Sequence, residues 1–169
     1  MAENQTRESG IGHAVTVNQE LVFPFPDGFH VMNPEERQNL RMFGEDAADC
    51  LADPERHMVI CIGYKQPPGW ALLMLSAKDL AKKAEAQLRK PMEQYGYRLT
   101  GFSERNLGGG KAHGFSFEYT AQGIEMYADS FVLKKGKTVY YFHCYARKAQ
   151  QAESAAVWQE MTEHISFSG

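Results

Sequence analysis

The side chains that could do chemistry in this chain are its three cysteines and six histidines. His143 and Cys144 are adjacent, but consecutive side chains of a strand point to opposite faces, so these two cannot act as base and nucleophile. His57 and Cys61 share a face of a predicted strand, yet at ~3.3 Å per residue they lie about 13 Å apart. The pattern therefore predicts no thiol catalysis. It favours buried structural cysteines over a disulfide framework, because their number is odd and no CxxC occurs.

Patterns that bind metals or phosphate are incomplete as well. The histidines form no HxxxH or HExxH, although a folded site could still gather two or three of them. Gly108-Gly109-Gly110-Lys111 has the look of a phosphate loop, but Arg105 and Ala112 stand where such a loop needs glycine and Ser/Thr. We expect a hairpin turn at these glycines, and we expect no metal, no cofactor and no catalytic residue.

Two groups of aromatic residues are candidates for binding a partner. Trp70 follows Pro67-Pro68-Gly69, where a tryptophan either fills the edge of a core or anchors a partner. The second group occupies predicted strands, where it forms either core beneath a covering helix or a partly covered surface for a partner. The predicted partner-binding residues of the two groups together are Trp70, Tyr127, Tyr141, His143 and Tyr145.

Composition limits the kind of protein to one globular domain that needs no disulfide. The chain has 169 residues, of which 43% are hydrophobic and 12% aromatic, and this suffices for a core. Its 18 basic and 21 acidic residues give a net charge of −3, so we expect no nucleic-acid partner. The longest apolar run, Trp70–Leu75, is far shorter than the roughly 20 residues that span a bilayer, so we expect no membrane insertion.

The segment from Asp27 to Glu55 is strongly acidic. It holds eight acids and two arginines, a local charge of −6. Its second half, Gly44–Glu55, has the composition of an irregular, solvated connection, and the acids do not match a calcium loop. A solvated loop and an acidic contact patch for a basic partner are the two interpretations of this segment.

The beginning of the chain has neither the apolar stretch of a secretory signal nor the arginine-rich character of a transit peptide. We expect a cytoplasmic protein, the alternative being an exported protein whose leader has been removed. Residues 1–12 are polar and carry two glycines, so we expect a flexible N-terminal tail before a single domain at 13–169.

Local patterns in the first half predict strands and two helices. His13–Phe25 is β-rich and should be ended by Pro24 and Pro26-Asp27-Gly28, and Phe29–Met32 resumes briefly as strand. Asn33-Pro34-Glu35-Glu36 is typical of a helix start, and we expect that helix to run to about Phe43. A strand at His57–Tyr64 precedes an amphipathic helix capped by Ser76, which Pro91 should kink or end.

After Gly96 the hydrophobic period changes from about 3.6 to 2 residues. This predicts four consecutive strands and a last helix, at Tyr97–Asn106, Ala112–Thr120, Gly123–Leu133, Thr138–Ala146 and Ala149–His164. The buried side of this helix should be formed by Ala149, Ala152, Ala156, Val157, Met161 and Ile165. Both alternating sets of Val139–Tyr145 are largely apolar or aromatic, so this strand should be covered on both faces. The sequence predicts an α+β protein: an αβα sandwich whose central, mostly antiparallel sheet has about six strands and helices on both faces.

Several short motifs resemble those of the PsbP-like family, which holds the photosystem II extrinsic protein PsbP, the Ran-binding import factor Mog and bacterial relatives. The resemblance spans roughly residues 20 to 167. It rests on structural motifs: Phe23-Pro24, Pro26–Phe29, Gly110–Tyr119, the pair Phe131–Leu133 and Thr138–Phe142, and Ile165–Phe167. The resemblance implies an αβα sandwich whose members bind other proteins and share no catalytic set.

We therefore expect a non-catalytic protein-binding or chaperone-like module, monomeric or homodimeric, whose partner is another protein. The alternative is a small-molecule-binding protein or an enzyme that uses a cleft between sheet and helix near His143 and Tyr141.

Overall fold

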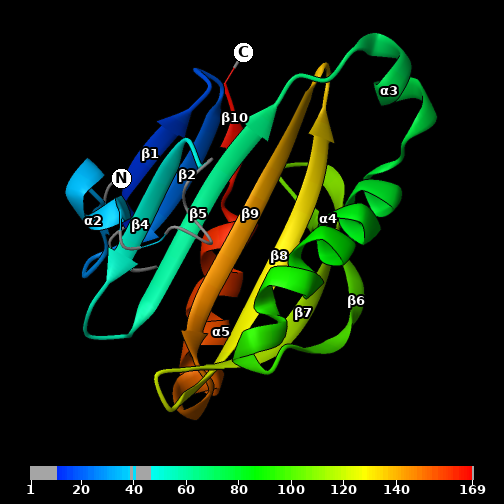
Figure 1. The fold of residues 1–169 in the computed structure, drawn as a ribbon. Coiled ribbons are helices and arrows are strands. Elements are labelled where there is room, and N and C mark those ends of the chain that lie inside the picture. The colour runs from blue at the N-terminus through cyan, green and yellow to red at the C-terminus, as the bar shows by residue number, and fades with distance from the viewer. Residues whose placement is uncertain (1–10, 39, 41–46, 169) are drawn as a thin grey trace.

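Seven antiparallel strands form the main sheet of the computed structural model, which describes residues 11–38, 40 and 47–168 (Figure 1). Each strand pairs with its neighbour in an antiparallel register. In sheet order, the strands are β3 (His30–Val31), β4 (Asp49–Asp53), β5 (Met58–Lys65), β9 (Thr138–Arg147), β8 (Ile124–Lys135), β7 (Gly110–Ala121) and β6 (Arg98–Leu107).

One face of this sheet is covered by a second, three-stranded sheet and by the last helix. The small sheet has the order β1 (Ile11–Val17), β2 (Leu21–Pro26) and β10 (Ser166–Phe167), and the helix is α5 (Gln151–Glu163). Phe23 of β2 lies at the centre of this core, with its ring 6.1 Å from Phe142 of β9 and 6.2 Å from Trp158 of α5. The large core cluster thus joins both sheets and α5.

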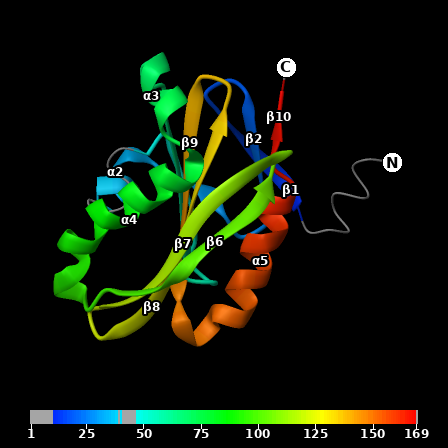
Figure 2. The same ribbon diagram turned by 90° about the vertical axis from the view of Figure 1, so that its right-hand side faces the viewer.

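The other face carries α4 (Ala77–Met92), which lies over β7 and β8, so the main sheet is sandwiched between α4 and α5 (Figure 2). Ser76 caps α4, as predicted, and the structure adds a reciprocal pair of hydrogen bonds between Ser76 and Asp79. The helix continues past Pro91 to Met92 and ends through a 3-10 turn at Gly96, whose positive φ of 71° suits glycine.

The predicted α+β sandwich is confirmed, but its strands are more numerous than predicted. Seven strands lie in the main sheet of the described residues where about six were expected, and three more form the small sheet. One predicted strand region, His13–Phe25, is a hairpin of β1 and β2. Pro24 does not end β2: it pairs with Ala14, and among the described residues β10 pairs with Leu21 and Val22 but not with Pro24. The strand ends at Pro26, where the Pro26-Asp27-Gly28 turn was predicted.

The predicted tail at 1–12 reaches into this small sheet. Ile11 and Gly12 belong to β1, and Ile11 is buried against the core. Residues 1–10 lie outside the described part of the chain.

The prediction of an irregular, solvated connection at Gly44–Glu55 is wrong for its second half. Cys50, Leu51 and Ala52 form the centre of β4 and are buried, because they pair in register with β5. Asp53 is buried too: its carboxylate accepts hydrogen bonds from the backbone amides of Glu55 and Arg56 and from the Arg56 guanidinium, the last at 2.5 Å. The acid organises the β4–β5 turn, and residues 44–46 lie outside the described residues.

Three helices also differ from expectation. The helix predicted from Asn33 to about Phe43 is α2 (Pro34–Gln38), and most of the remainder lies outside the described residues. A short helix, α3 (Gly69–Met74), was not predicted. The expected buried side of the last helix was wrong in its alanines: Ala149, Ala152 and Ala156 are exposed, because α5 turns Ser154, Trp158, Met161 and Thr162 inward.

Candidate interaction surface

The short helix α3 stands at one end of the molecule, beyond the end of β5 and beside the β8–β9 hairpin (Figure 1). Pro68 precedes it in an extended conformation, and a proline at that place removes no helical hydrogen bond. The helix ends where Leu75 becomes extended and Ser76 begins α4. Two helix boundaries therefore confine α3 to six residues.

Lys134 of β8 fixes the C-terminal end of α3. Its Nζ donates hydrogen bonds to the carbonyl oxygens of Leu72 at 2.6 Å and of Leu75 at 2.9 Å. The last carbonyls of a helix have no partner within the helix, and the negative end of the helix dipole favours a cation there. The Leu72 side chain packs with Leu80 and with a small buried cluster of Ala81, Val132 and Val139.

The remaining large side chains of α3 point into solvent. Trp70 is 70% exposed, Leu73 90% and Met74 74%, more than any other large hydrophobic residue among the described ones. A six-residue helix that rests on Leu72 has no second layer to cover its other side. We call these three residues the α3 tip.

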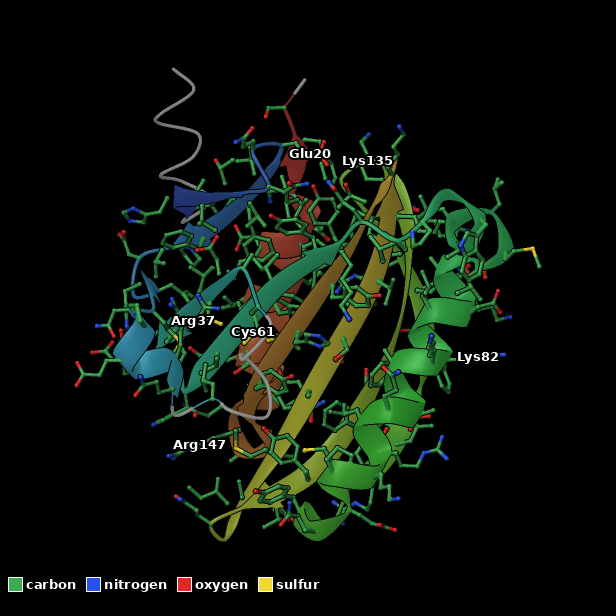
Figure 3. The ribbon with its side chains drawn as sticks, turned by 45° about the horizontal axis from the view of Figure 1, so that its top comes forward. Glu20, Arg37, Cys61, Lys82, Lys135 and Arg147 are labelled. Carbon is green, nitrogen blue, oxygen red and sulfur yellow. The ribbon has the colours of Figure 1, made fainter. Side chains whose placement is uncertain are left out.

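Several lysines belong to the elements next to α3, although the Nζ of Lys135 lies over the Phe167 ring, 5.1 Å from its centre, on the β10 side of the sheet. Between Lys65 and Lys83 the chain holds four lysines and one acid, Asp79, and the β8–β9 hairpin adds Lys134, Lys135 and Lys137 without an acid. Lys135 lies at the hairpin and Lys82 extends from α4 into solvent (Figure 3). A protein of net charge −3 thus carries a locally basic end at its most exposed apolar residues.

The other predicted site residues lie on the sheet: Tyr141 packs against the same small cluster as Leu72 of α3, whereas Tyr145 and Tyr127 belong to the two other core clusters. Tyr141, His143 and Tyr145 alternate along β9 on the face that α4 partly covers. Tyr127 belongs to the opposite face and to the core beneath α5. Tyr127 and Tyr145 are buried, while Tyr141 and His143 are half-buried.

His143 is held as a neutral, hydrogen-bonded side chain. Its Nδ1 lies 2.7 Å from the hydroxyl of the buried Ser130, and its ring stacks on Tyr145 with 6.2 Å between the ring centres. Burial lowers the pKa of His143 to about 4, so the ring carries no charge at neutral pH. His143 and Cys144 point to opposite faces, as expected of strand neighbours.

Among the described residues, no group of three or more His, Cys, Asp or Glu side chains could hold a metal ion. No described helix is long and apolar enough to cross a bilayer.

The arrangement of strands and helices matches that of solved proteins. CyanoP, the cyanobacterial PsbP of Synechocystis sp. PCC 6803, superimposes with a TM-score of 0.69 over 92% of each chain at 9% sequence identity. This chain has the PsbP-like fold. The Ran-binding protein Mog1p of Saccharomyces cerevisiae matches with a TM-score of 0.54 at 10% identity over 90% of this chain and 93% of its own. LpqN of Mycobacterium tuberculosis, involved in cell envelope biogenesis, matches with a TM-score of 0.54 at 13% identity over 88% and 83%.

These identities are so low that the likeness shows the PsbP-like fold alone. No protein-family model matches the sequence, and no curated protein resembles it closely enough in sequence to count as a relative.

Sequence reasoning missed two parts of the α3 surface within this PsbP-like fold. Leu73 and Met74 belong to the apolar run Trp70–Leu75, whose length excludes a membrane span but does not by itself predict an exposed helix. The signal that could have found them is the position of this run between Pro68 and the Ser76 cap, which leaves room for less than two helical turns. Lys134 gives no local signal, because its acceptors lie about 60 residues away in the chain.

Proposed function

We propose that this chain is a non-catalytic protein-binding module that contacts its partner through the α3 tip. The observation that carries the proposal is the exposure of Trp70, Leu73 and Met74 on a helix that Lys134 and Leu72 hold in place. Large apolar residues that gather on a surface mark interaction sites, whereas single exposed ones are ordinary.

The α3 tip has the composition of a binding hot spot. Tryptophan is enriched among the residues that contribute most to protein interfaces, and methionine is enriched at interface cores. Because Lys134 already fixes the carbonyls of Leu72 and Leu75, the helix loses little conformational entropy when a partner docks. The tip is therefore organised before it binds.

The lysines define the chemistry of the partner. Lys65, Lys78 and Lys137 are exposed near the ends of the elements next to α3. A basic rim around an apolar centre is complementary to an apolar pocket bordered by acidic residues, and the charges would speed association at low salt. That a Ran-binding protein has the same fold supports the use of this scaffold for protein binding.

The half-buried His143 and Tyr141 support no catalytic role. His143 is neutral, bonded to Ser130 and stacked on Tyr145. Such a residue is typical of a satisfied side chain within the sheet layer.

The test is site-specific photo-crosslinking in a lysate of the native host. A photoreactive amino acid replaces Leu73, the most exposed large hydrophobic residue among the described ones. A matched protein carries it at Ile124, which is 38% exposed at the start of β8, and the β7–β8 turn lies at the other end of the molecule from α3 (Figure 1). We expect one protein to be captured from position 73 and not from position 124. Trp70→Ala should weaken binding of the purified partner at least about 10-fold, and Ile124→Ala less than about 2-fold.

Three results would contradict the proposal. Equal capture at both positions would show that the α3 tip is not the contact. Trp70-dependent sedimentation with anionic vesicles, without a captured protein, would make the tip a membrane-binding element. A dimer in sedimentation velocity that Trp70→Ala dissociates would make it a self-association surface.

A further inference from the structure

Two of the three cysteines lie directly opposite each other on neighbouring strands. Cys50 of β4 pairs in register with Cys61 of β5, and their sulfur atoms are 3.3 Å apart. Directly opposed residues of antiparallel strands have Cα atoms about 4.5–5.5 Å apart, within the range that a disulfide bridges. The backbone therefore already holds these thiols where a bond between them can form.

The two thiols are unequal. In the thiolate form of Cys50, the Cys61 thiol donates a hydrogen bond to it, and the nearby Arg37 guanidinium adds a positive charge, so the pKa of Cys50 is lowered. The same pairing and burial raise the pKa of Cys61. Arg37 is fixed near this place, because its guanidinium donates to the carbonyl oxygens of Ala47 and Ala48 just before β4. Figure 3 labels Arg37 on α2 and Cys61 on β5, with β4 between this helix and β5.

We propose that Cys50 and Cys61 are a redox modification site, at which a low-molecular-weight disulfide of the glutathione type converts the two thiols into a disulfide between β4 and β5. The Cys50 thiolate attacks one sulfur of the small disulfide, which forms a mixed disulfide and releases one thiolate. Cys61 then attacks the Cys50 sulfur, and the second small thiol leaves with the Cys61 proton. Two protein thiols are oxidised and one small disulfide is reduced to two thiols, so the step balances.

The position of β4 near the edge of the sheet determines how the small disulfide can reach Cys50. Both sulfurs are shielded from solvent in the folded protein, so β4 must open locally before it reacts. Among the described residues, β4 pairs on its side away from β5 with the two residues of β3, whereas Cys144 lies on β9 between two long strands. Opening at β4 therefore breaks fewer hydrogen bonds than opening at Cys144, which makes Cys144 an internal control.

A disulfide between Cys50 and Cys61 would link β4, which belongs to the acidic segment Asp27–Glu55, covalently to β5. The amide of Met32 donates to the carbonyl oxygen of Cys50 at 2.8 Å, and β3 pairs with β4, so these segments depend on the position of β4. A covalent link from β4 to β5 would hold them in the oxidised protein. This site is remote from α3 in its contacts and does not depend on the proposed partner.

The test uses the full chain and oxidised glutathione, followed by alkylation of free thiols and digestion with trypsin under non-reducing conditions. Arg56 lies between the two cysteines, so trypsin separates the peptide 42–56 from the peptide 57–65 unless a disulfide joins them. We expect the joined mass in most molecules, its loss after reduction with dithiothreitol, and Cys144 recovered as an alkylated thiol.

Single variants test the assignment of roles. Cys61→Ser should stop at one glutathione on Cys50, because the second attack cannot occur, and Cys50→Ser should take up glutathione at least about 10-fold more slowly. Faster labelling of Cys61 than of Cys50 would overturn the assignment. Separate peptides with both cysteines alkylated, both in native buffer and in urea below the unfolding transition, would overturn the proposal.

Discussion

The α3 tip and the aromatic row of β9 both contain large aromatic residues, but they differ in burial. The row consists of Tyr141, His143 and Tyr145, which are buried or half-buried, whereas the side chains of the tip are exposed. The row lies within a sheet, where neighbouring strands stand about 4.8 Å away on each side and α4 partly covers the face. The α3 tip belongs to a helix that is held to the body through Leu72 and through the carbonyl groups of Leu72 and Leu75. Whether an aromatic residue is core or surface is therefore decided by the number of elements around it and not by its type.

The difference also separates two kinds of energetic role. In the row, hydrogen bonding and stacking hold His143 in one arrangement, and burial stabilises the fold. At the α3 tip, the apolar side chains become buried only when a partner binds over them. Mutations in the row should change stability, and mutations at the tip should change binding.

The largest effect should come from Tyr145→Ala. Tyr145 is 5% exposed in the cluster between the sheet and α4, and removal of its ring leaves a cavity. We expect the free energy of unfolding to fall by about 3–5 kcal/mol, as for other large aromatic residues replaced by alanine. Denaturant unfolding followed by circular dichroism measures this loss.

Tyr145→Phe is the matched control, since it keeps the ring and should lose much less. If Tyr145→Ala costs under about 1 kcal/mol, the row is a surface, and the contrast with the α3 tip disappears.

The next effect is a pH dependence that His143 imposes on stability. Burial lowers its folded pKa to about 4 from an unfolded value near 6.5, so between these values the unfolded chain binds more protons. The contribution of the neutral ring is thus fully present above about pH 6.5 and is lost as the pH falls toward 4. Because the side chain is half-buried, we expect a loss of about 1–3 kcal/mol across this window, measured by urea unfolding at a series of pH values.

Carboxyl groups ordinarily titrate at about pH 4, in the lower part of the same window. The contribution of His143 is therefore obtained as the difference in unfolding free energy between the protein and a variant without this histidine. His143→Gln keeps a polar group near Ser130 and should flatten the curve between pH 6.5 and 5. Parallel curves for the two proteins would mean that His143 protonates freely, as an exposed residue does.

A smaller effect is expected from Lys134→Met, which removes the donor that fixes α3 and keeps the length of the side chain. Two charge-assisted hydrogen bonds to Leu72 and Leu75 are lost at a half-exposed position. We expect a local loss of about 1 kcal/mol, seen as roughly fivefold faster hydrogen exchange at the Leu75 amide, which bonds to the Ala71 carbonyl. Lys135→Met, one residue along the hairpin, is the control and should leave this exchange unchanged.

Much of the fold could be predicted because its signals are local. The period-2 pattern after Gly96, the Ser76 cap with Asp79, and the glycine turns at Gly123 and Gly136 each specify an element from neighbouring residues. The αβα layering followed from the apolar residues on both sides of β9.

What could not be predicted depends on pairing across the chain. In β4 only three apolar residues stand between Asp49 and Asp53, and they become a strand because β5 offers a matching edge. The contact of Cys50 with Cys61 needs that register, and the fixing of α3 needs Lys134, far away in sequence. Among the candidate residues, the exposure of Trp70 and the burial of Tyr127 and Tyr145 depend on layers that local patterns do not describe.

The smallest effect on stability should come from Trp70→Ala, alone or with Leu73→Ala. These side chains contact little in the free protein, being 70% and 90% exposed, so the free energy of unfolding should change by less than about 0.5 kcal/mol. The same denaturant titration used for Tyr145→Ala measures it, and Leu72→Ala, on the buried side of the same helix, should cost more than either change. A loss above about 1 kcal/mol for Trp70→Ala would mean that the indole packs on the body of the protein in solution. A Trp70→Ala protein that keeps its stability but no longer captures the partner would show that this exposed tryptophan serves binding, because it does not stabilise the fold.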